Sequence, residues 1–144
     1  MNAHEPVVIL MIEDDPGHAR LIEKNVRRAG VANEIVHKAD GTSALDYLFT
    51  ENVRDNGPLL ILLDLNLPDM SGVDILAKIK SDDKLKRSPV IVLTTTDDKT
   101  EIQRCYDLGA NVYITKPVDY DSFSNAIRQL GLFLSVIKVP EVEA

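Results

Sequence analysis

The chain has 144 residues, of which 44% are hydrophobic and 27% charged, a composition typical of one soluble globular domain with its own core. Its 16 Lys and Arg against 23 Asp and Glu give a net charge of −7, which disfavours sequence-independent binding to nucleic acid. No apolar run approaches the roughly 18 residues of a membrane span, no signal-peptide pattern is present, and the single cysteine excludes an internal disulfide. We therefore expect a cytoplasmic protein that binds neither nucleic acid nor membrane.

Five apolar runs, each followed by a helical pattern, alternate along the chain. The first run ends in three carboxylates, after which Asp15 and Pro16 predict a helix start and Gly30 predicts its end. Clusters of Gly, Pro, Asn and Asp separate several of the later segments. The predicted strands cover 7–12, 33–39, 59–64, 90–93 and 111–115, and the predicted helices cover 16–29, 41–49, 73–80, 97–108 and 119–137.

This alternation predicts the α/β fold class, with a five-stranded parallel sheet and helices on both of its faces. The sequence contains no repeat, low-complexity tract or linker. We therefore expect a single domain over 1–144, with a core over about 7–130 and a C-terminal helix or tail extension over 131–144.

The run at 59–63 consists of five apolar residues and leads directly into Asp64. An unbroken run of this length predicts a strand that is buried on both faces. In an open parallel sheet, ligands and chemistry collect at the carboxyl ends of the strands. Asp64 is therefore expected where a reactive group would be presented.

Polar side chains also follow the neighbouring predicted strands. The first strand leads into Glu13 and Asp14, the fourth into Thr94 and the fifth into Lys116. We expect them to meet Asp64, because the carboxyl ends of parallel strands share one edge of the sheet. Three adjacent carboxylates repel one another unless a cation joins them, and oxygen ligands suit Mg²⁺. A nucleophilic carboxylate beside a divalent metal, an ammonium and a hydroxyl predicts a site that accepts a phosphoryl group.

The segments EDD at 13–15, DLNLPDMSG at 64–72 and KP at 116–117, together with Thr94, have the order and spacing of a known family. Over about residues 7–130 the chain resembles the response-regulator receiver (CheY-like) domains of two-component signalling. The resemblance implies a flavodoxin-like, doubly wound (βα)5 domain that works as a stand-alone response regulator. Such a protein takes a phosphoryl group from a sensor histidine kinase in a Mg²⁺-dependent reaction. It is a signalling protein with slow autodephosphorylation rather than an enzyme.

The resemblance also implies roles for the residues that handle the phosphoryl group. Asp64 would be the phospho-acceptor, and Thr94 and Lys116 would bind the phosphoryl oxygens. Tyr113 occupies the position of the family's switch aromatic, although an aromatic residue there is also typical of a core or sheet edge. The bond between Lys116 and Pro117 would be cis.

The metal site implied by the resemblance contains four residues. Asp14 and Asp64 would bind Mg²⁺ directly, Glu13 would act mainly through water, and the backbone carbonyl of Asn66 would complete the protein ligands.

The chain departs from the commonest family pattern at several positions. Glu13 replaces a more frequent aspartate, which the family tolerates. Thr95 stands where a small alanine is usual, and we expect it to narrow access to the pocket and alter the dephosphorylation rate. Thr96 and Asp15 are expected nearby, where they could position or obstruct the hydrolytic water.

The last predicted helix carries two apolar faces. One explanation is a longer helix that folds back on its own core. The other is a symmetric homodimer through the helix over 97–108, the strand over 111–115 and the last helix with its tail. The run LFLSVIKVP resembles the tails of small receivers that work with phytochrome-type kinases, including bacteriophytochromes. The first face carries Phe123, Ile127, Leu130, Leu134 and Ile137, and the second carries Leu132, Phe133 and Val136.

Two other classes share parts of this pattern. Metal-dependent phosphohydrolases with an aspartyl-phosphate intermediate favour a second acid two residues after the nucleophile, where this chain has Asn66. Nucleotide or flavin modules on a similar sheet would carry GxGxxG or GxxxxGK[ST] after the first strand, and neither motif follows it here.

His4, His18 and His37 lack ligand spacing and are expected on the solvated surface, whereas Cys105 is expected to face partly inward.

Overall fold

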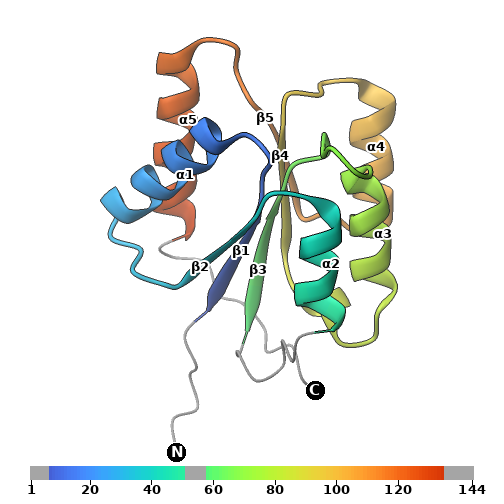
Figure 1. Cartoon of the computed structure of the whole chain (residues 1–144). Helices are drawn as coiled ribbons and strands as arrows, with labels where there is room; N and C mark the ends of the chain where they lie inside the picture. The colour runs from blue at the N-terminus through green and yellow to red at the C-terminus, as the bar shows by residue number, and fades with distance from the viewer. Residues whose placement is uncertain (1–6, 51–57, 135–144) are drawn as a thin grey trace, which may run out of the picture.

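The computed structural model describes residues 7–50 and 58–134, in which strands and helices alternate (Figure 1). The fourth strand is preceded by a short 3₁₀ helix, η2 (Leu85–Arg87). The strands are β1 (Val8–Ile12), β2 (Ile35–Lys38), β3 (Leu59–Leu63), β4 (Val90–Thr94) and β5 (Val112–Thr115). The helices are α1 (Pro16–Arg28), α2 (Gly41–Phe49), α3 (Gly72–Ser81), α4 (Lys99–Leu108) and α5 (Tyr120–Leu134).

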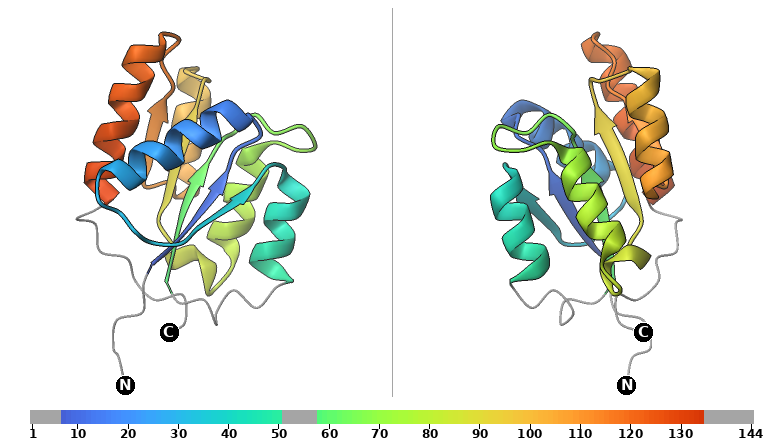
Figure 2. Two further views of the ribbon diagram at one scale, coloured as in Figure 1. Left: turned by 60° about the vertical axis from the view of Figure 1, so that its left-hand side comes forward. Right: turned by 90° about the vertical axis from the view of Figure 1, so that its right-hand side faces the viewer.

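The five strands form one parallel sheet in the order β2-β1-β3-β4-β5. Every residue of β1, β3 and β4 is buried, so both faces of the sheet centre need a cover of helices. Helices α1 and α5 lie on one face, and α2, α3 and α4 lie on the other (Figures 1 and 2). The predicted α/β fold class is therefore confirmed.

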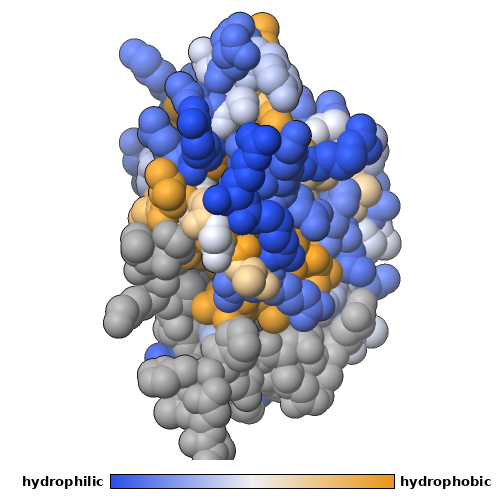
Figure 3. Space-filling view, turned by 90° about the vertical axis from the view of Figure 1, so that its left-hand side faces the viewer, coloured by the Kyte–Doolittle hydropathy of each residue, from blue (hydrophilic) through white to orange (hydrophobic). Residues whose placement is uncertain are grey.

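The sheet divides the hydrophobic core into two clusters, because successive side chains of a strand point to opposite faces. Ile9 and Met11 of β1 pack beneath α1 and α5, whereas Leu10 and Ile12 pack beneath α2, α3 and α4. Each fully buried side chain of this size contributes roughly 1.5–3 kcal/mol to folding. Among the described residues, hydrophilic side chains cover most of the outer surface on the α1 and α5 side, with smaller apolar patches between them (Figure 3), as expected for helices that bury one face.

Short polar side chains start the helices that follow the strands. The Asp15 carboxylate accepts hydrogen bonds from the backbone N–H groups of Gly17 and His18, as predicted for the start of α1. Asp40, Ser71 and Asp98 cap α2, α3 and α4 in the same way. Each cap lies where the connection from the preceding strand ends and the helix begins. The first turns of these helices therefore border the carboxyl edge of the sheet.

Some boundaries differ from the predictions. Helix α4 begins at Lys99 rather than at residue 97, because Asp98 is its N-cap. The charged connection over 81–89 contains η2, which the sequence pattern did not indicate. Helix α5 is described as far as Leu134, so the predicted continuation to 137 and the tail lie outside the described residues. Among the described helices, none has the length and apolar character needed to cross a membrane.

The prediction of a cis bond between Lys116 and Pro117 is wrong, since the described residues contain no cis peptide bond. Even before proline the trans form is favoured by about 0.5–1 kcal/mol. The backbone N–H of Lys116 donates to the carbonyl of Thr94 at 2.6 Å, next to the β4–β5 pairing. This pairing carries Lys116 to the edge of the sheet without a cis bond after it.

Candidate functional site

The carboxyl ends of four strands bring the predicted polar residues together. Glu13 follows β1, Asp64 follows β3, Thr94 ends β4 and Lys116 follows β5. All four are buried, whereas the neighbouring Asp14 is exposed. One edge of the parallel sheet therefore holds two buried carboxylates, an exposed one, a hydroxyl and an ammonium.

The ammonium of Lys116 lies at the centre of this group. Its Nζ donates to Glu13 Oε1 at 2.6 Å and to Asp64 Oδ2 at 3.0 Å, and it lies 3.0 Å from His18 Nδ1. The side chains of Lys116 and Glu13 are each only 2% exposed. A buried charge needs such partners, because an unpaired ion in the interior would cost several kcal/mol.

Asp64 receives hydrogen bonds on both of its carboxylate oxygens. Oδ1 accepts from the Thr94 hydroxyl at 2.8 Å and from the backbone N–H of Asn66 at 3.0 Å, while Oδ2 accepts from Lys116. The three donors come from β4, from the residue after β5 and from the β3–α3 loop, so they fix the orientation of the Asp64 carboxylate at the end of β3.

Glu13, Asp14 and Asp64 form a candidate metal site. Each offers one carboxylate oxygen, and these three atoms lie within 4.8 Å of one another. Burial raises the pKa of Glu13 to about 7, against the lowering effect of the Lys116 ammonium. A cation beside these groups would favour their charged forms, and an all-oxygen donor set suits Mg²⁺. The residues present therefore fit a hard divalent cation.

The loop between β3 and α3 is held against the site by close packing and by hydrogen bonds. At Gly72 any Cβ atom would lie 2.5 Å from the carbonyl oxygen of Asp64, so only glycine fits there. The Asp69 carboxylate accepts from the backbone N–H groups of Gly41 and Thr42, and from the Thr42 hydroxyl at 2.6 Å. The same hydrogen bonds lower the pKa of Asp69 to about 2. The loop is thus anchored to the N-terminus of α2.

Asn66 and Tyr113 both contact the threonines at the end of β4. The amide nitrogen of Asn66 lies 3.3 Å from the hydroxyl oxygens of Thr94, Thr95 and Thr96. The half-buried Tyr113 donates its hydroxyl to the carbonyl of Thr96 at 2.6 Å, and burial raises its pKa to about 12. Tyr113 is therefore a protonated donor tied to the segment that carries Thr94.

His18 is the site residue that the sequence analysis missed, because it was expected on the solvated surface. Its position in the first turn after the acidic end of β1 was the available signal. His37 is exposed as expected, although its Nε2 lies 2.7 Å from the carbonyl of Glu13. His4 lies outside the described residues, and Cys105 is fully buried. Asp15 is exposed and caps α1, which places it at the rim of the site.

A model of the response regulator receiver domain matches residues 9–128 of the chain. The chain belongs to this family. Receiver domains are phospho-acceptor signalling proteins that pair with histidine kinases and bind Mg²⁺ in an acidic pocket. The alternative of a metal-dependent phosphohydrolase finds no support.

Individual receiver proteins resemble the chain over nearly its full length. A crystal structure of a receiver domain from Rhodospirillum rubrum has 66% sequence identity and a TM-score of 0.90, covering 95% of this chain and 99% of that one. Response regulator Rcp1 from Synechocystis sp. is 38% identical over 96% of each protein. The phosphorylated cyanobacterial phytochrome response regulator RcpA has 39% identity and a TM-score of 0.83, covering 96% of this chain and 99% of that one. The chain is thus a receiver domain whose relatives include phytochrome response regulators.

Proposed function

We propose that Asp64 is the residue of this receiver domain that accepts the phosphoryl group. The main support for this proposal is the set of contacts that the Asp64 carboxylate makes at the end of the central strand β3. Lys116 donates to one carboxylate oxygen at 3.0 Å and Thr94 donates to the other at 2.8 Å. Both donors are positioned to remain beside an anion that forms on Asp64.

In the proposed step, a carboxylate oxygen of Asp64 attacks the phosphorus atom of a phosphohistidine on a sensor kinase. The P–N bond breaks, and its electron pair stays on the imidazole nitrogen of the kinase histidine. Lys116 and Thr94 then donate hydrogen bonds to phosphoryl oxygens. Both donors already lie within hydrogen-bonding distance of the Asp64 carboxylate, so they start beside the charge that is transferred.

The cofactor in this proposal is Mg²⁺, held by Asp14, Asp64 and the backbone carbonyl of Asn66, with Glu13 acting mainly through water. When bound, the ion neutralises charge on the transferring oxygens. The spacing of the three carboxylates and the chemistry of the donors support this assignment. The relative Rcp1 has also been crystallised in a Mn²⁺-bound form.

The proposed switch connects Asp64 to the α4-β5-α5 face through Thr94 and Tyr113. Phosphorylation adds about −1.5 to −2 charges, by analogy with other phosphorylated side chains, and draws the Thr94 hydroxyl toward the new anion. Movement of this segment shifts the carbonyl oxygen of Thr96, which accepts the hydrogen bond of the Tyr113 hydroxyl before phosphorylation. Tyr113 then turns inward, and the face that it borders changes its affinity for a partner.

The proposed partner is a phytochrome-type sensor kinase of the class that includes bacteriophytochromes. The relative RcpA is a phytochrome response regulator, and RtBRR, which has 34% sequence identity to this chain, is a bacteriophytochrome response regulator. We also propose a single-domain organisation with Pro117 as a structural residue of the β5–α5 connection. The near-complete coverage of Rcp1 supports that organisation. A cytoplasmic location is part of the same proposal, and the buried free thiol of Cys105 fits a reducing compartment.

We further propose a homodimer through the α4-β5-α5 face and the C-terminal tail. On α5, Leu132 and Phe133 are 55% and 42% exposed, and Tyr106 on α4 is 45% exposed. The Tyr106 hydroxyl accepts the backbone N–H of Tyr113, so this ring lies beside β5, an edge strand of the sheet. Exposed apolar and aromatic side chains on adjacent elements favour a symmetric contact.

The test of the central proposal is phosphorylation with a small donor. The protein is incubated with acetyl phosphate and Mg²⁺, and its intact mass is measured. We expect the mass to increase by one phosphoryl group, and Asp64→Asn to prevent this increase. The matched control is Asp74→Asn, since Asp74 is an exposed aspartate in the first turn of α3. A gain that survives Asp64→Asn would show that another residue is the acceptor.

A further inference from the structure

His18 lies in the first turn of α1, and its side chain reaches the end of the fifth strand. Its Nδ1 atom is 3.0 Å from Nζ of Lys116, although the two residues are 98 positions apart in the sequence. The other contacts of this Nζ are to the carboxylates of Glu13 and Asp64. Among the described residues, His18 is therefore the one hydrogen-bonding partner of the Lys116 ammonium that is not a carboxylate.

The hydrogen-bonding direction at His18 follows from the chemistry of the lysine. An ammonium has three N–H donors and no acceptor, so Nδ1 of His18 must accept and the ring proton must lie on Nε2. The three contacts together use all three donors of Lys116. Because the Lys116 side chain is only 2% exposed, a donor without a partner would be costly at this place.

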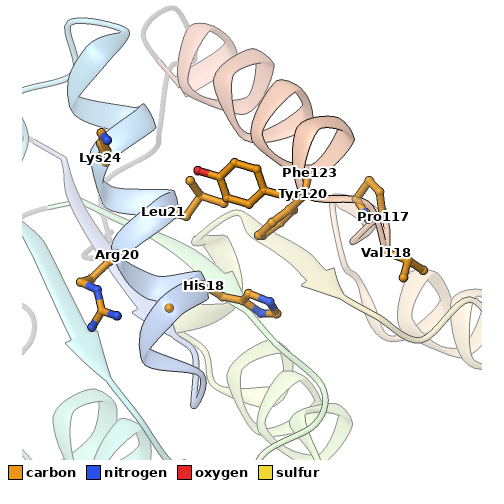
Figure 4. Close-up of a pocket in the computed structure, with 9 residues that line it drawn as sticks. His18, Arg20, Leu21, Lys24, Pro117, Val118, Tyr120 and Phe123 are labelled. Carbon is orange, nitrogen blue, oxygen red and sulfur yellow. The ribbon is translucent and has the colours of Figure 1, made fainter.

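The ring of His18 is itself held from a second helix. Its centroid lies 5.1 Å from that of the buried Phe123 ring of α5, at an interplanar angle of 65°, which is an edge-to-face contact. The ring also borders a cavity of about 590 Å³ between α1 and the β5–α5 connection, toward which it points from α1 (Figure 4). The side chain is 35% exposed, so the ring is held by its contacts with Phe123 and Lys116 rather than by complete burial.

We propose that His18 is a positioning residue for phosphoryl transfer, because it accepts the third proton of the Lys116 ammonium and so holds Nζ beside Asp64. This inference rests on the proposed function of Asp64 and Lys116. Glu13 and Asp64 also belong to the candidate metal site, whereas His18 does not. His18 thus offers Lys116 an acceptor that has no second role in the metal site.

Removal of this acceptor has a definite geometric consequence. Glu13 is the shortest contact of Lys116 at 2.6 Å, and Asp64 is farther away at 3.0 Å. With one donor unsatisfied, the flexible lysine side chain shifts toward Glu13 and away from Asp64. The ammonium is then misplaced for the oxygens of a phosphoryl group on Asp64.

Two substitutions at position 18 separate hydrogen bonding from packing. In His18→Asn the amide oxygen is bonded to Cγ, as Nδ1 is in histidine, so it can accept the same proton. In His18→Leu the apolar contact with Phe123 is kept and the acceptor is lost. The matched control is Lys24→Leu, since Lys24 lines the same cavity on α1 and is not one of the three hydrogen-bonding partners of the Lys116 ammonium.

The first measurement is the rate of phosphorylation by acetyl phosphate at saturating Mg²⁺, which does not involve kinase docking. We expect His18→Leu to be about tenfold slower, near the lower end of the effect of losing a hydrogen bond to a charged group. His18→Asn should stay within about threefold of the wild type, because it keeps an acceptor. Lys24→Leu should match the wild type.

The second measurement needs neither metal nor phosphoryl donor. In ¹⁵N-lysine spectra, a buried ammonium with three hydrogen bonds exchanges its protons slowly and gives a resolved signal, which Lys116→Arg identifies by its loss. We expect this signal in the wild type and in His18→Asn, and its broadening or loss in His18→Leu.

The outcomes separate this proposal from the one on which it rests. A wild type that gains no phosphoryl group contradicts the proposed function of Asp64. A phosphorylated wild type with an equally fast His18→Leu overturns the role of His18. The role is also overturned if His18→Asn is as slow as His18→Leu, because ring packing alone would then explain the loss.

Discussion

At Glu13, burial and a neighbouring ammonium act in opposite directions on one carboxyl group. Burial disfavours the charged form more strongly than Lys116 favours it, and the pKa rises from 4.5 to about 7. The negative charge of Asp64 also raises this pKa. Glu13 is therefore a residue whose charge changes within the physiological pH range.

This pKa predicts a pH-dependent affinity for Mg²⁺. Protonated Glu13 cannot support a cation as a carboxylate can, so the proton and the metal compete. With a pKa of about 7, the charged fraction increases about tenfold between pH 6 and pH 8, and we expect the association constant to increase by a similar factor. Titration calorimetry at the two pH values measures this change.

Glu13→Gln is the control for that experiment, since it keeps the shape of the side chain and removes its titration. We expect this variant to bind Mg²⁺ more weakly at pH 8 and to lose most of the pH dependence. An unchanged pH dependence in Glu13→Gln would show that the charge of Glu13 is not its cause.

The individual residues of the site differ in how well the sequence could predict them. Glu13, Asp14, Asp64, Thr94 and Lys116 follow apolar runs, so parallel pairing alone brings them to one edge of the sheet. The contact of His18 with Lys116 depends on the rotation of α1 and on the packing of Phe123. The position of His18 after the acidic end of β1 places it near the site, but its contact with Lys116 arises from tertiary packing, which the sequence does not show.

At the scale of the elements, α1 and α5 approach each other very closely at Gly131. A Cβ atom at this position would lie 2.9 Å from the Cβ of Ala29 and 3.0 Å from the carbonyl oxygen of Asn25. The two helices carry His18 and Phe123, so their separation also sets the edge-to-face contact of these rings.

Gly131→Ala is therefore expected to destabilise the protein although alanine favours helices. The added methyl group must push α5 from α1, and overpacking of this kind costs about 1 to 3 kcal/mol. Chemical denaturation measures the loss of unfolding free energy. Gln129→Ala on the exposed side of α5 is the control and should change this free energy little; equal effects of the two substitutions would contradict the packing argument.

The elements themselves were largely predictable, because each central strand is an apolar run and most helices begin after a capping residue. The exact start of α4 and the short η2 helix before β4 were less predictable. The predicted helix over 97–108 included Asp98, whereas the structure shows Asp98 as the N-cap of α4. The η2 turn depends on the Asp82 carboxylate, which accepts the backbone N–H groups of Lys84 and Leu85.

At the scale of the whole molecule, the sheet separates a face of α1 and α5 from a face of α2, α3 and α4, and the site lies at the edge between them. The resemblance of the chain to receiver domains was predictable from the order of its motifs, and the family match confirms it. For the apolar C-terminal segment the sequence left two explanations open, a helix that folds back on its own core and a homodimer, and part of this segment lies outside the described residues.

The proposed homodimer predicts self-association that depends on the state of Asp64. Beryllofluoride mimics the phosphoryl group, and with Mg²⁺ we expect it to strengthen association, raising the mass from light scattering above the 16.0 kDa monomer. Phe133→Ser should weaken association by removing an exposed aromatic contact, whereas Gln129→Ser should not. A monomer at every concentration, with and without beryllofluoride, would contradict the dimer.

The most direct test of the whole account is a crystal structure of the protein with Mg²⁺ and beryllofluoride. We predict one ion bound by Asp14, Asp64 and the carbonyl of Asn66, and a beryllofluoride group on the Asp64 carboxylate within hydrogen-bonding distance of Thr94 and Lys116. A structure without an ion at these carboxylates, or with the anion bound away from Asp64 and Lys116, would contradict the account.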